Sequence, residues 1–301
     1  MSEPLEGAPP QVRRGSLGIV MALASSFGFA LIPIFALYAY RGGIGVSTLL
    51  FIRFALAAAL LFGYLAVTRK PVKQALPAWP SLALLGAFYT MQSAFYFTAV
   101  RHIPAALASL ILYSYPAFVC LLALLFEREK PSVRIIAALG VSLAGVTFVL
   151  GTSFGSASLI GVLYALGASA VYSFYITVAN RTLRRVEPFT AMACISLVSS
   201  ACFAVLGAVL RSLDFRFLPA TWLPILALIG ISTLGAIFAF FRSITLIGPN
   251  KTAIVSMTEP LFTIGLSALL FAERLTLKQA LGGALVLTGT VLITADARRR
   301  C

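Results

Sequence analysis

Residues 115–129 read YPAFVCLLALLFERE, and residues 259–273 read EPLFTIGLSALLFAE. In each stretch a proline opens an apolar run, which passes through a Leu-Leu-Phe triplet and ends near a glutamate. Sliding the chain on itself by 144 residues puts Pro116 on Pro260 and the final glutamates of the two stretches on one another. This self-similarity indicates that the chain contains two related halves.

The composition is that of a membrane protein. The 301 residues are 60% hydrophobic and only 11% charged, and the mean hydropathy is +0.99. Most of the sequence is apolar on every helical face rather than along one stripe, which a soluble globule of this size could not hide. Soluble enzymes, secreted disulfide scaffolds and disordered chains are therefore excluded.

Ten segments are long enough to cross a hydrocarbon core of about 30 Å. They cover residues 17–38, 46–67, 82–100, 105–126, 133–150, 159–179, 189–210, 223–247, 253–272 and 275–294. None alternates apolar and polar residues as the strands of a membrane barrel do. The sequence therefore predicts an all-α integral membrane protein with ten transmembrane helices.

Positive charges predict the orientation. The formal net charge is +14, but the charges lie mainly between apolar segments, so they indicate topology rather than binding to nucleic acid. With the N-terminus inside, 15 Lys and Arg face the cytoplasm and six face outward, while Arg53 and Arg242 lie within spans. This asymmetry predicts an N-in/C-in protein with the lipid bilayer as its partner.

The sequence carries no signature of catalysis or of a cofactor. The four cysteines form no CxxC or Cys/His cluster, which argues against a disulfide framework and a metal site. A glycine-rich nucleotide loop, a nucleophile with its base and a paired-carboxylate site are also missing. We therefore expect neither an enzyme nor a bound cofactor.

The two halves are expected to be inverted. A shift of 143 residues brings Gly18 onto Gly161, near the start of each half. Five spans per half is an odd number, so the second half enters the membrane from the opposite side. The predicted divisions are a cytoplasmic tail (1–15), two five-helix repeats (16–151 and 157–294) and a basic cytoplasmic tail (295–301). Two such halves of nearly equal energy favour alternating access.

The repeated blocks resemble a known family. The sequences RHIPAALASLILYSYP (101–116), TEPLF (258–262), AERLT (272–276) and GGALVLTG (282–289) resemble EamA-type helices of the drug/metabolite transporter superfamily. Bacterial exporters of aromatic and neutral amino acids are the most similar members. The resemblance implies ten helices, an N-in/C-in topology and a central cavity formed mainly by helices 3, 4, 8 and 9, with contributions from helices 1 and 6.

The third predicted span, 82–100, carries a polar face. Tyr89, Gln92, Ser93 and Tyr96 stand at i, i+3, i+4 and i+7, so they share one side of the helix. Polar groups in mid-membrane face protein or water, which predicts a cavity wall, with interhelical packing as the alternative. Tyr113 and Tyr172, like Tyr164 and Tyr175, add aromatic surface whose facing the sequence leaves open.

The ninth predicted span, 253–272, and the residue before it carry a polar stripe centred on Glu259. Its members are Thr252, Ser256, Glu259, Thr263 and Ser267. Glu259 lies 11 residues past Gly248, which is about 16 Å at 1.5 Å per residue and so near the midplane. A bare carboxylate is costly there, so we expect it to be protonated, paired or hydrated.

Three roles for Glu259 stay open. It binds a substrate ammonium, it carries a proton in antiport, or it pairs with Arg242 and locks helix 8 against helix 9. Arg242 lies roughly 9 Å from the cytoplasmic end of helix 8 and is long enough to approach Glu259.

Three prolines inside predicted spans are candidate hinges, with static kinks as the alternative. They are Pro33, Pro116 and Pro260. Each lacks an N–H group and so frees the carbonyl oxygen four residues earlier. Those carbonyls belong to Phe29, Leu112 and Ser256.

Four further charged or titratable residues are given structural roles. Arg53, roughly 10 Å from the outer surface, is expected to snorkel or to pair locally. His102, the sole histidine, is expected to be an interface anchor at the outer edge. Glu129 and Glu273 are expected to anchor helix ends.

These observations predict a secondary transporter or facilitator of the bacterial inner membrane that exports aromatic or other neutral amino acids, or similar small metabolites. A monomer is sufficient for this site. A sugar-phosphate or nucleotide-sugar antiporter is the alternative within transport, and it calls for a basic cavity. A membrane-embedded enzyme and a non-transporting membrane subunit are the alternatives of another class.

Overall fold

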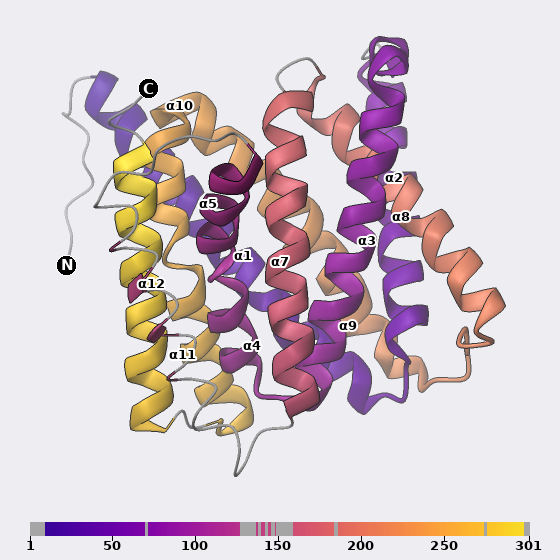
Figure 1. Ribbon diagram of the computed structural model, residues 1–301. Helices are drawn as coiled ribbons and strands as arrows, with labels where there is room; N and C mark the ends of the chain where they lie inside the picture. The colour runs from indigo at the N-terminus through magenta and orange to yellow at the C-terminus, as the bar shows by residue number, and fades with distance from the viewer. Residues whose placement is uncertain are drawn as a thin grey trace, which may run out of the picture.

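The computed structural model describes residues 10–69, 72–126, 159–183, 186–273 and 276–297, with isolated positions between 137 and 148. Within these ranges the protein is a helical bundle without strands (Figure 1). The predicted fifth span, 133–150, lies almost wholly outside the described residues. The helices are α1 (Pro10–Arg41), α2 (Val46–Val67), η1 (Val72–Ala78), α3 (Trp79–His102), α4 (Ala105–Leu112), α5 (Tyr115–Phe126), α7 (Leu159–Thr182), α8 (Pro188–Val209), η2 (Pro219–Thr221), α9 (Trp222–Ala227), η3 (Leu228–Gly235), α10 (Ala236–Ser256), α11 (Glu259–Phe271) and α12 (Leu277–Ala297).

Seven stretches of the described chain are long and apolar enough to cross a membrane. They are Gly15–Arg41, Val46–Val67, Ala105–Leu122, Leu159–Ala179, Pro188–Val209, Pro219–Pro249 and Lys251–Phe271. Each overlaps a predicted span. The third and tenth predicted spans are also helical, as α3 and α12. The prediction of an all-α membrane protein is therefore confirmed.

The first helices of the two halves, α1 and α7, run in opposite directions. Near the end of α1, Tyr38 packs on Phe271 at the end of α11, with 5.1 Å between ring centroids. Just after α11, Glu273 accepts a hydrogen bond from the start of α4. At the same end of the bundle His102, which closes α3, lies against Gly161 at the start of α7. Helix α1 therefore finishes where α7 begins, and we call this the Glu273 end.

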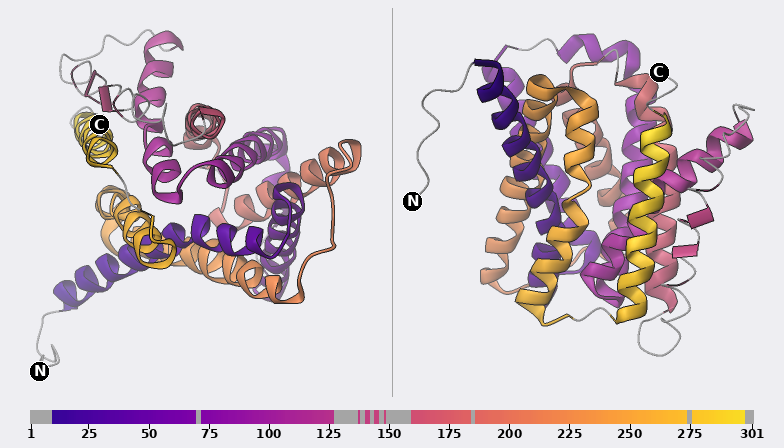
Figure 2. Two further views of the ribbon diagram at one scale, coloured as in Figure 1. Left: turned by 90° about the horizontal axis from the view of Figure 1, so that it is seen from below. Right: turned by 90° about the vertical axis from the view of Figure 1, so that its left-hand side faces the viewer.

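The two halves pack against each other through equivalent contacts. The left view of Figure 2 shows the bundle end-on. Helix α1 packs chiefly against α10, and α7 packs chiefly against α3. A β-carbon on Gly18 would overlap Ile247, and one on Gly161 would overlap Ile103. Ile103 and Ile247 are 144 residues apart, so the repeat predicted from the sequence recurs in the packing.

Two predicted spans are interrupted, each just before its proline. Residues 105–126 divide into α4 and α5, and residues 253–272 divide between the end of α10 and α11. The segments after the breaks begin at Tyr115 and Glu259, again 144 residues apart. By contrast, α1 continues through Pro33 without a break.

The carbonyls that the two break prolines free are bonded to hydroxyls from other helices. Ser169 on α7 donates to the carbonyl oxygen of Leu112 at 3.2 Å. Tyr113, which follows α4, donates to the carbonyl oxygen of Ser256 at 3.4 Å. A membrane interior has no water to do this, so these two bonds are what make the breaks tolerable.

The predicted eighth span, 223–247, is less regular than expected. It contains η3, a π-helical segment, in which the Thr233 hydroxyl donates to the carbonyl oxygen of Leu228 at 3.0 Å. The span then ends at a kink at Gly248, whose φ is 81°. Glycine suits this left-handed conformation because it has no β-carbon.

Glu273 caps a helix of the opposite half. Its carboxylate accepts hydrogen bonds from the backbone N–H groups of Ala105 at 3.3 Å and Ala106 at 3.5 Å. A negative charge at a helix N-terminus is favourable because unpaired N–H groups point at it. Glu273 therefore joins the end of α11 to the start of α4, while Glu129 lies outside the described residues.

Replacing Ser169 with alanine tests the importance of the hydrogen bonds at the breaks. Ser169→Ala leaves the Leu112 carbonyl without this donor, so we expect a loss of about 1–3 kcal/mol and a lower midpoint of thermal unfolding in detergent. Ser173→Ala is the matched control, because Ser173 only donates back to Ala170 within α7. Equal midpoints for the two variants would show that the break does not depend on Ser169.

Candidate functional site

Five tyrosines from α3, α7 and the first helix break form a continuous cluster, which we call the tyrosine cluster. Tyr89 packs on Tyr175 with 5.5 Å between ring centroids, and Tyr175 stacks on Tyr172 at 5.7 Å. Tyr172 meets Tyr115 edge-on at 4.8 Å, and Tyr115 meets Tyr113 at 6.2 Å. All but Tyr175 are half-buried, so part of their surface is not covered by protein.

Glu259 lies at the edge of this cluster. It opens α11 at the second break and is half-buried. Its carboxylate is hydrogen-bonded to the Tyr113 hydroxyl, and Tyr96, Tyr115 and Tyr172 are close enough to interact with its charge. The groups around this acidic side chain are therefore phenols from α3, α5, α7 and the first break.

The pairing of Glu259 with Arg242, one of the three roles left open by the sequence, is not formed in the structure. Arg242 is exposed, and its backbone carbonyl accepts a bond from Thr245. Among the residues that the structure describes, no ion pair joins it to Glu259. The two side chains stand on helices that are consecutive in sequence, but the side chain of Arg242 is exposed whereas that of Glu259 is half-buried.

The predicted polar face of α3 is divided between two environments. Tyr89 belongs to the tyrosine cluster, and Tyr96 is buried and hydrogen-bonded to Ser109 of α4. Ser93 and Gln92 are also buried, and the Ser93 hydroxyl donates to the Gln92 side-chain oxygen at 3.3 Å. The structure thus brings the two tyrosines of this face to Glu259 and the cluster, and pairs the other two residues with each other.

The predicted polar stripe of the ninth span, which runs from the end of α10 into α11, is similarly divided. Thr252 bonds to Ser243 at 2.8 Å, which ties the two arms of the Gly248 kink together. The Thr263 hydroxyl donates to the backbone carbonyl of Glu259 at 3.2 Å. The Ser256 hydroxyl is buried and has no hydrogen-bond partner in the described part of the chain. Ser256 and Glu259 flank the break, so this stripe meets the cluster at those two positions.

Arg53 differs from the expectation in its surroundings. Arg53 is only 3% exposed, and its Nε donates to the Thr233 hydroxyl at 3.1 Å. It neither snorkels nor pairs with an acidic residue of the described ranges. The sequence held one signal of this contact. Thr233 stands 144 residues after Tyr89 and so occupies the equivalent position in the second half.

His102 lies away from this site. Its ring stacks on Tyr164 at 6.5 Å between centroids, and Tyr164 also contacts Phe95 at 5.7 Å. His102 closes α3 at the Glu273 end. Tyr164 is therefore the one tyrosine of α7 that does not belong to the cluster.

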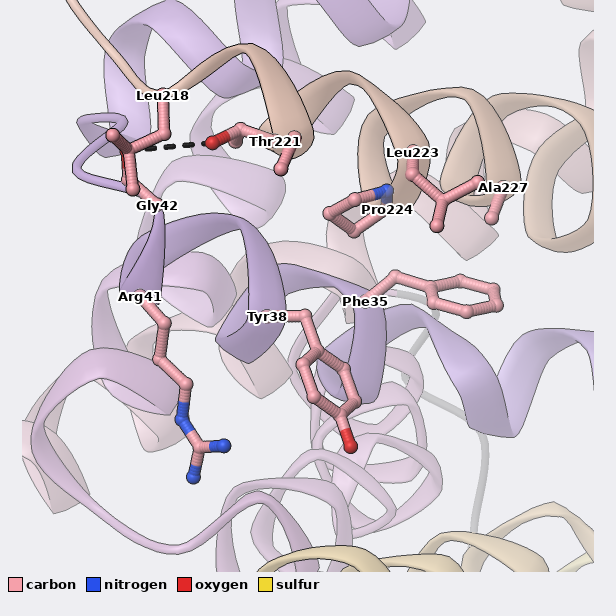
Figure 3. A pocket seen from close by; sticks show the side chains of 10 residues that line it. Phe35, Tyr38, Arg41, Gly42, Leu218, Thr221, Leu223, Pro224 and Ala227 are labelled. Carbon is pink, nitrogen blue, oxygen red and sulfur yellow. Dashed lines mark hydrogen bonds between the residues drawn. The ribbon is translucent and has the colours of Figure 1, made fainter.

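A groove of about 480 Å³ opens between α1 and α9 (Figure 3). Its lining is mostly apolar and includes Phe35, Tyr38 and Leu223. Arg41 lies at its rim, with the guanidinium 4.7 Å from the centroid of the Phe271 ring. None of the residues predicted to form the substrate cavity lines this groove, so it is separate from the tyrosine cluster.

A family model described as the EamA-like transporter family matches this chain twice, over residues 16–151 and 159–295. The two matches together cover most of the sequence. They also separate the halves whose packing is equivalent in the structure.

Curated relatives carry transporter names. The uncharacterized transporter YcbK of Bacillus subtilis is 24% identical over 283 residues, which is 90% of this chain and 91% of YcbK. The uncharacterized inner membrane transporter YicL of Salmonella typhimurium is 28% identical and covers 72% of this chain and 73% of its own. The aromatic amino acid exporter YddG of Salmonella typhimurium is 26% identical over 68% of this chain and 71% of YddG.

A solved crystal structure has the same fold. It superposes with a TM-score of 0.64 at 22% identity and covers 94% of this chain and 98% of its own. The two family matches identify the chain as a member of the EamA-like transporter family, and with its apolar helices and its inner membrane relative YicL it is a multi-pass protein of the inner membrane.

Proposed function

We propose that this protein exports aromatic and other neutral amino acids by alternating access. The observation that carries the proposal is the tyrosine cluster, whose rings extend from α3 to the first helix break and meet Glu259 at the second. Phenol rings pack well on aromatic side chains, and a carboxylate attracts an ammonium group. The aromatic amino acid exporter YddG, a relative at 26% identity, supports the same substrate class.

The proposed architecture has ten spans in two inverted halves, 16–151 and 157–294, with the tails 1–15 and 295–301 in the cytoplasm. The excess of Lys and Arg on one side supports the cytoplasmic placement of the tails, and the opposite directions of α1 and α7 support the inversion of the halves. The Glu273 end is then the outer end, where Glu273 joins α11 to α4. The breaks at Pro116 and Pro260 serve as the hinges.

Glu259 has two proposed tasks, since Arg242 does not reach it. It binds the ammonium group of the substrate, and it carries the proton when transport is coupled to a pH gradient. The buried Ser256 hydroxyl beside it, which has no partner in the described residues, supplies a further polar contact for a ligand. Tyr96 supplies the aromatic wall from α3.

Counterflow of labelled amino acids in proteoliposomes tests the proposed substrate class. The wild-type protein should exchange phenylalanine and tryptophan with saturable kinetics. Tyr172→Ala should raise the KM for these substrates about tenfold, because lost ring contacts are worth around 1.4 kcal/mol. The same variant should change the KM for the substrate alanine much less. Tyr164→Ala, the same change on the same helix but outside the cluster, should leave these KM values near wild type.

Two results would count against the proposed substrate class. Folded wild-type protein that exchanges no amino acid would remove it and bring sugar phosphates forward. A Tyr172→Ala variant that loses all substrates equally would indicate damaged packing rather than a lost contact.

Glu259→Gln tests the proton-carrying role. Glutamine keeps the shape of the side chain but cannot titrate, so flux in this variant should no longer respond to a pH gradient that drives the wild-type protein. Glu273→Gln is the control, because Glu273 caps α4 at the far end of α11, and its flux should keep the wild-type response. An unchanged response in folded Glu259→Gln protein would assign proton coupling to another group.

A further inference from the structure

Arg53 is a buried cation whose described partners are all uncharged. Its Nε donates to the Thr233 hydroxyl at 3.1 Å, and the Tyr89 hydroxyl accepts a second hydrogen bond. Its guanidinium carbon lies 5.2 Å from the Phe54 ring centroid and 5.3 Å from that of Phe97. A guanidinium has five N–H donors, so these contacts leave donor capacity unused.

Four acidic side chains whose surroundings the structure describes are engaged elsewhere. Glu187 caps α8 through the Thr190 N–H group at 2.8 Å, and Asp214 accepts from the Arg216 N–H group at 2.8 Å. Glu273 caps α4, and Glu259 is bonded to Tyr113. A buried charge without a counter-charge is costly, and in membranes such residues commonly mark a substrate path.

Arg53 and Glu259 are linked to the same aromatic surface. Tyr89 bonds to Arg53 and packs its ring on Tyr175 of the tyrosine cluster. Tyr96 is close enough to interact with the charges of both Arg53 and Glu259. A cation and a carboxylate therefore flank one set of phenols, which is the charge pattern that a zwitterion complements.

The local backbone holds Arg53 in this position. Thr233 stands in the π-helical segment η3, and its hydroxyl proton is committed to the Leu228 carbonyl at 3.0 Å. The same oxygen can therefore only accept from Arg53. A π-helical turn is rare and is often found at functional sites.

We infer that Arg53 is the anion-binding residue of the substrate site and takes the carboxylate of the transported amino acid, while Glu259 takes the ammonium. This inference rests on the proposed function. A planar guanidinium matches a carboxylate through two parallel hydrogen bonds. One arginine suits a monoanion, and the tyrosine cluster between the two charges would hold the apolar side chain.

Three ligands that share a phenyl group test the inference. Phenylalanine has both charges, phenethylamine lacks the carboxylate, and 3-phenylpropionate lacks the ammonium. Their Kd values would be measured by calorimetry with the purified full-length protein. Wild type should bind phenylalanine more tightly than either analogue. Because a hydrogen bond to a charged group contributes a factor of about 10 to 100, Arg53→Gln should weaken phenylalanine and 3-phenylpropionate by that factor and change phenethylamine less than about twofold.

Two variants serve as controls. Glu259→Gln should show the reverse pattern, weakening phenylalanine and phenethylamine but not 3-phenylpropionate. Arg53→Lys keeps the charge and should retain part of the preference for ligands with a carboxylate, and it is the variant to use if Arg53→Gln does not fold.

The outcomes separate the inference from the proposed function. If wild type binds phenylalanine and phenethylamine equally, or if the Arg53 variants weaken all three ligands alike, Arg53 is a packing residue and the inference is wrong while amino acid transport stands. If folded wild-type protein binds none of the three ligands, the proposed substrate class is wrong and the inference fails with it.

Discussion

A membrane interior offers no water to a free backbone carbonyl, so a helix break within it must find its donor in the protein. Here each donor comes from the opposite half. Ser169, in the second half, bonds the freed carbonyl of Leu112 in the first, and Tyr113, in the first half, bonds that of Ser256 in the second. Neither of these two carbonyls takes its side-chain donor from its own half, so the two halves depend on each other at the breaks.

The two halves share their helix arrangement but differ in their charged residues. The 144-residue shift pairs Tyr115 with Glu259, so the same position after the break is a neutral phenol in one half and a carboxylate in the other. It pairs Arg53 with Leu197, which is 44% exposed. Repeat symmetry therefore accounts for the crossing helices and the breaks, whereas both charges arise from positions at which the halves differ.

The features that depend on local chemistry were predictable from the sequence. Apolar length predicts the spans, and the repeated prolines at 116 and 260 indicate where α5 and α11 separate from the preceding helices, although α1 continues through Pro33. The surroundings of Arg53 could not be predicted, because they are made by Thr233 and Tyr89, which are remote from it in sequence. The depth of Arg242 in its span and the length of its side chain allow it to approach Glu259, but they do not determine which way that side chain turns.

Tyr113 connects the site to the second break through a single proton. A phenol has one proton to donate, and Tyr113 is placed between the Ser256 carbonyl and the Glu259 carboxylate. When an ammonium group or a proton satisfies the carboxylate, the phenol is released to bond the carbonyl. When the carboxylate is bare, it competes for the same proton. At the first break the donor is Ser169, whose hydroxyl contacts Leu112 and Ser114 and no carboxylate of the described residues. Under the proposed mechanism, a ligand or proton at Glu259 therefore acts on the second break and not directly on the first.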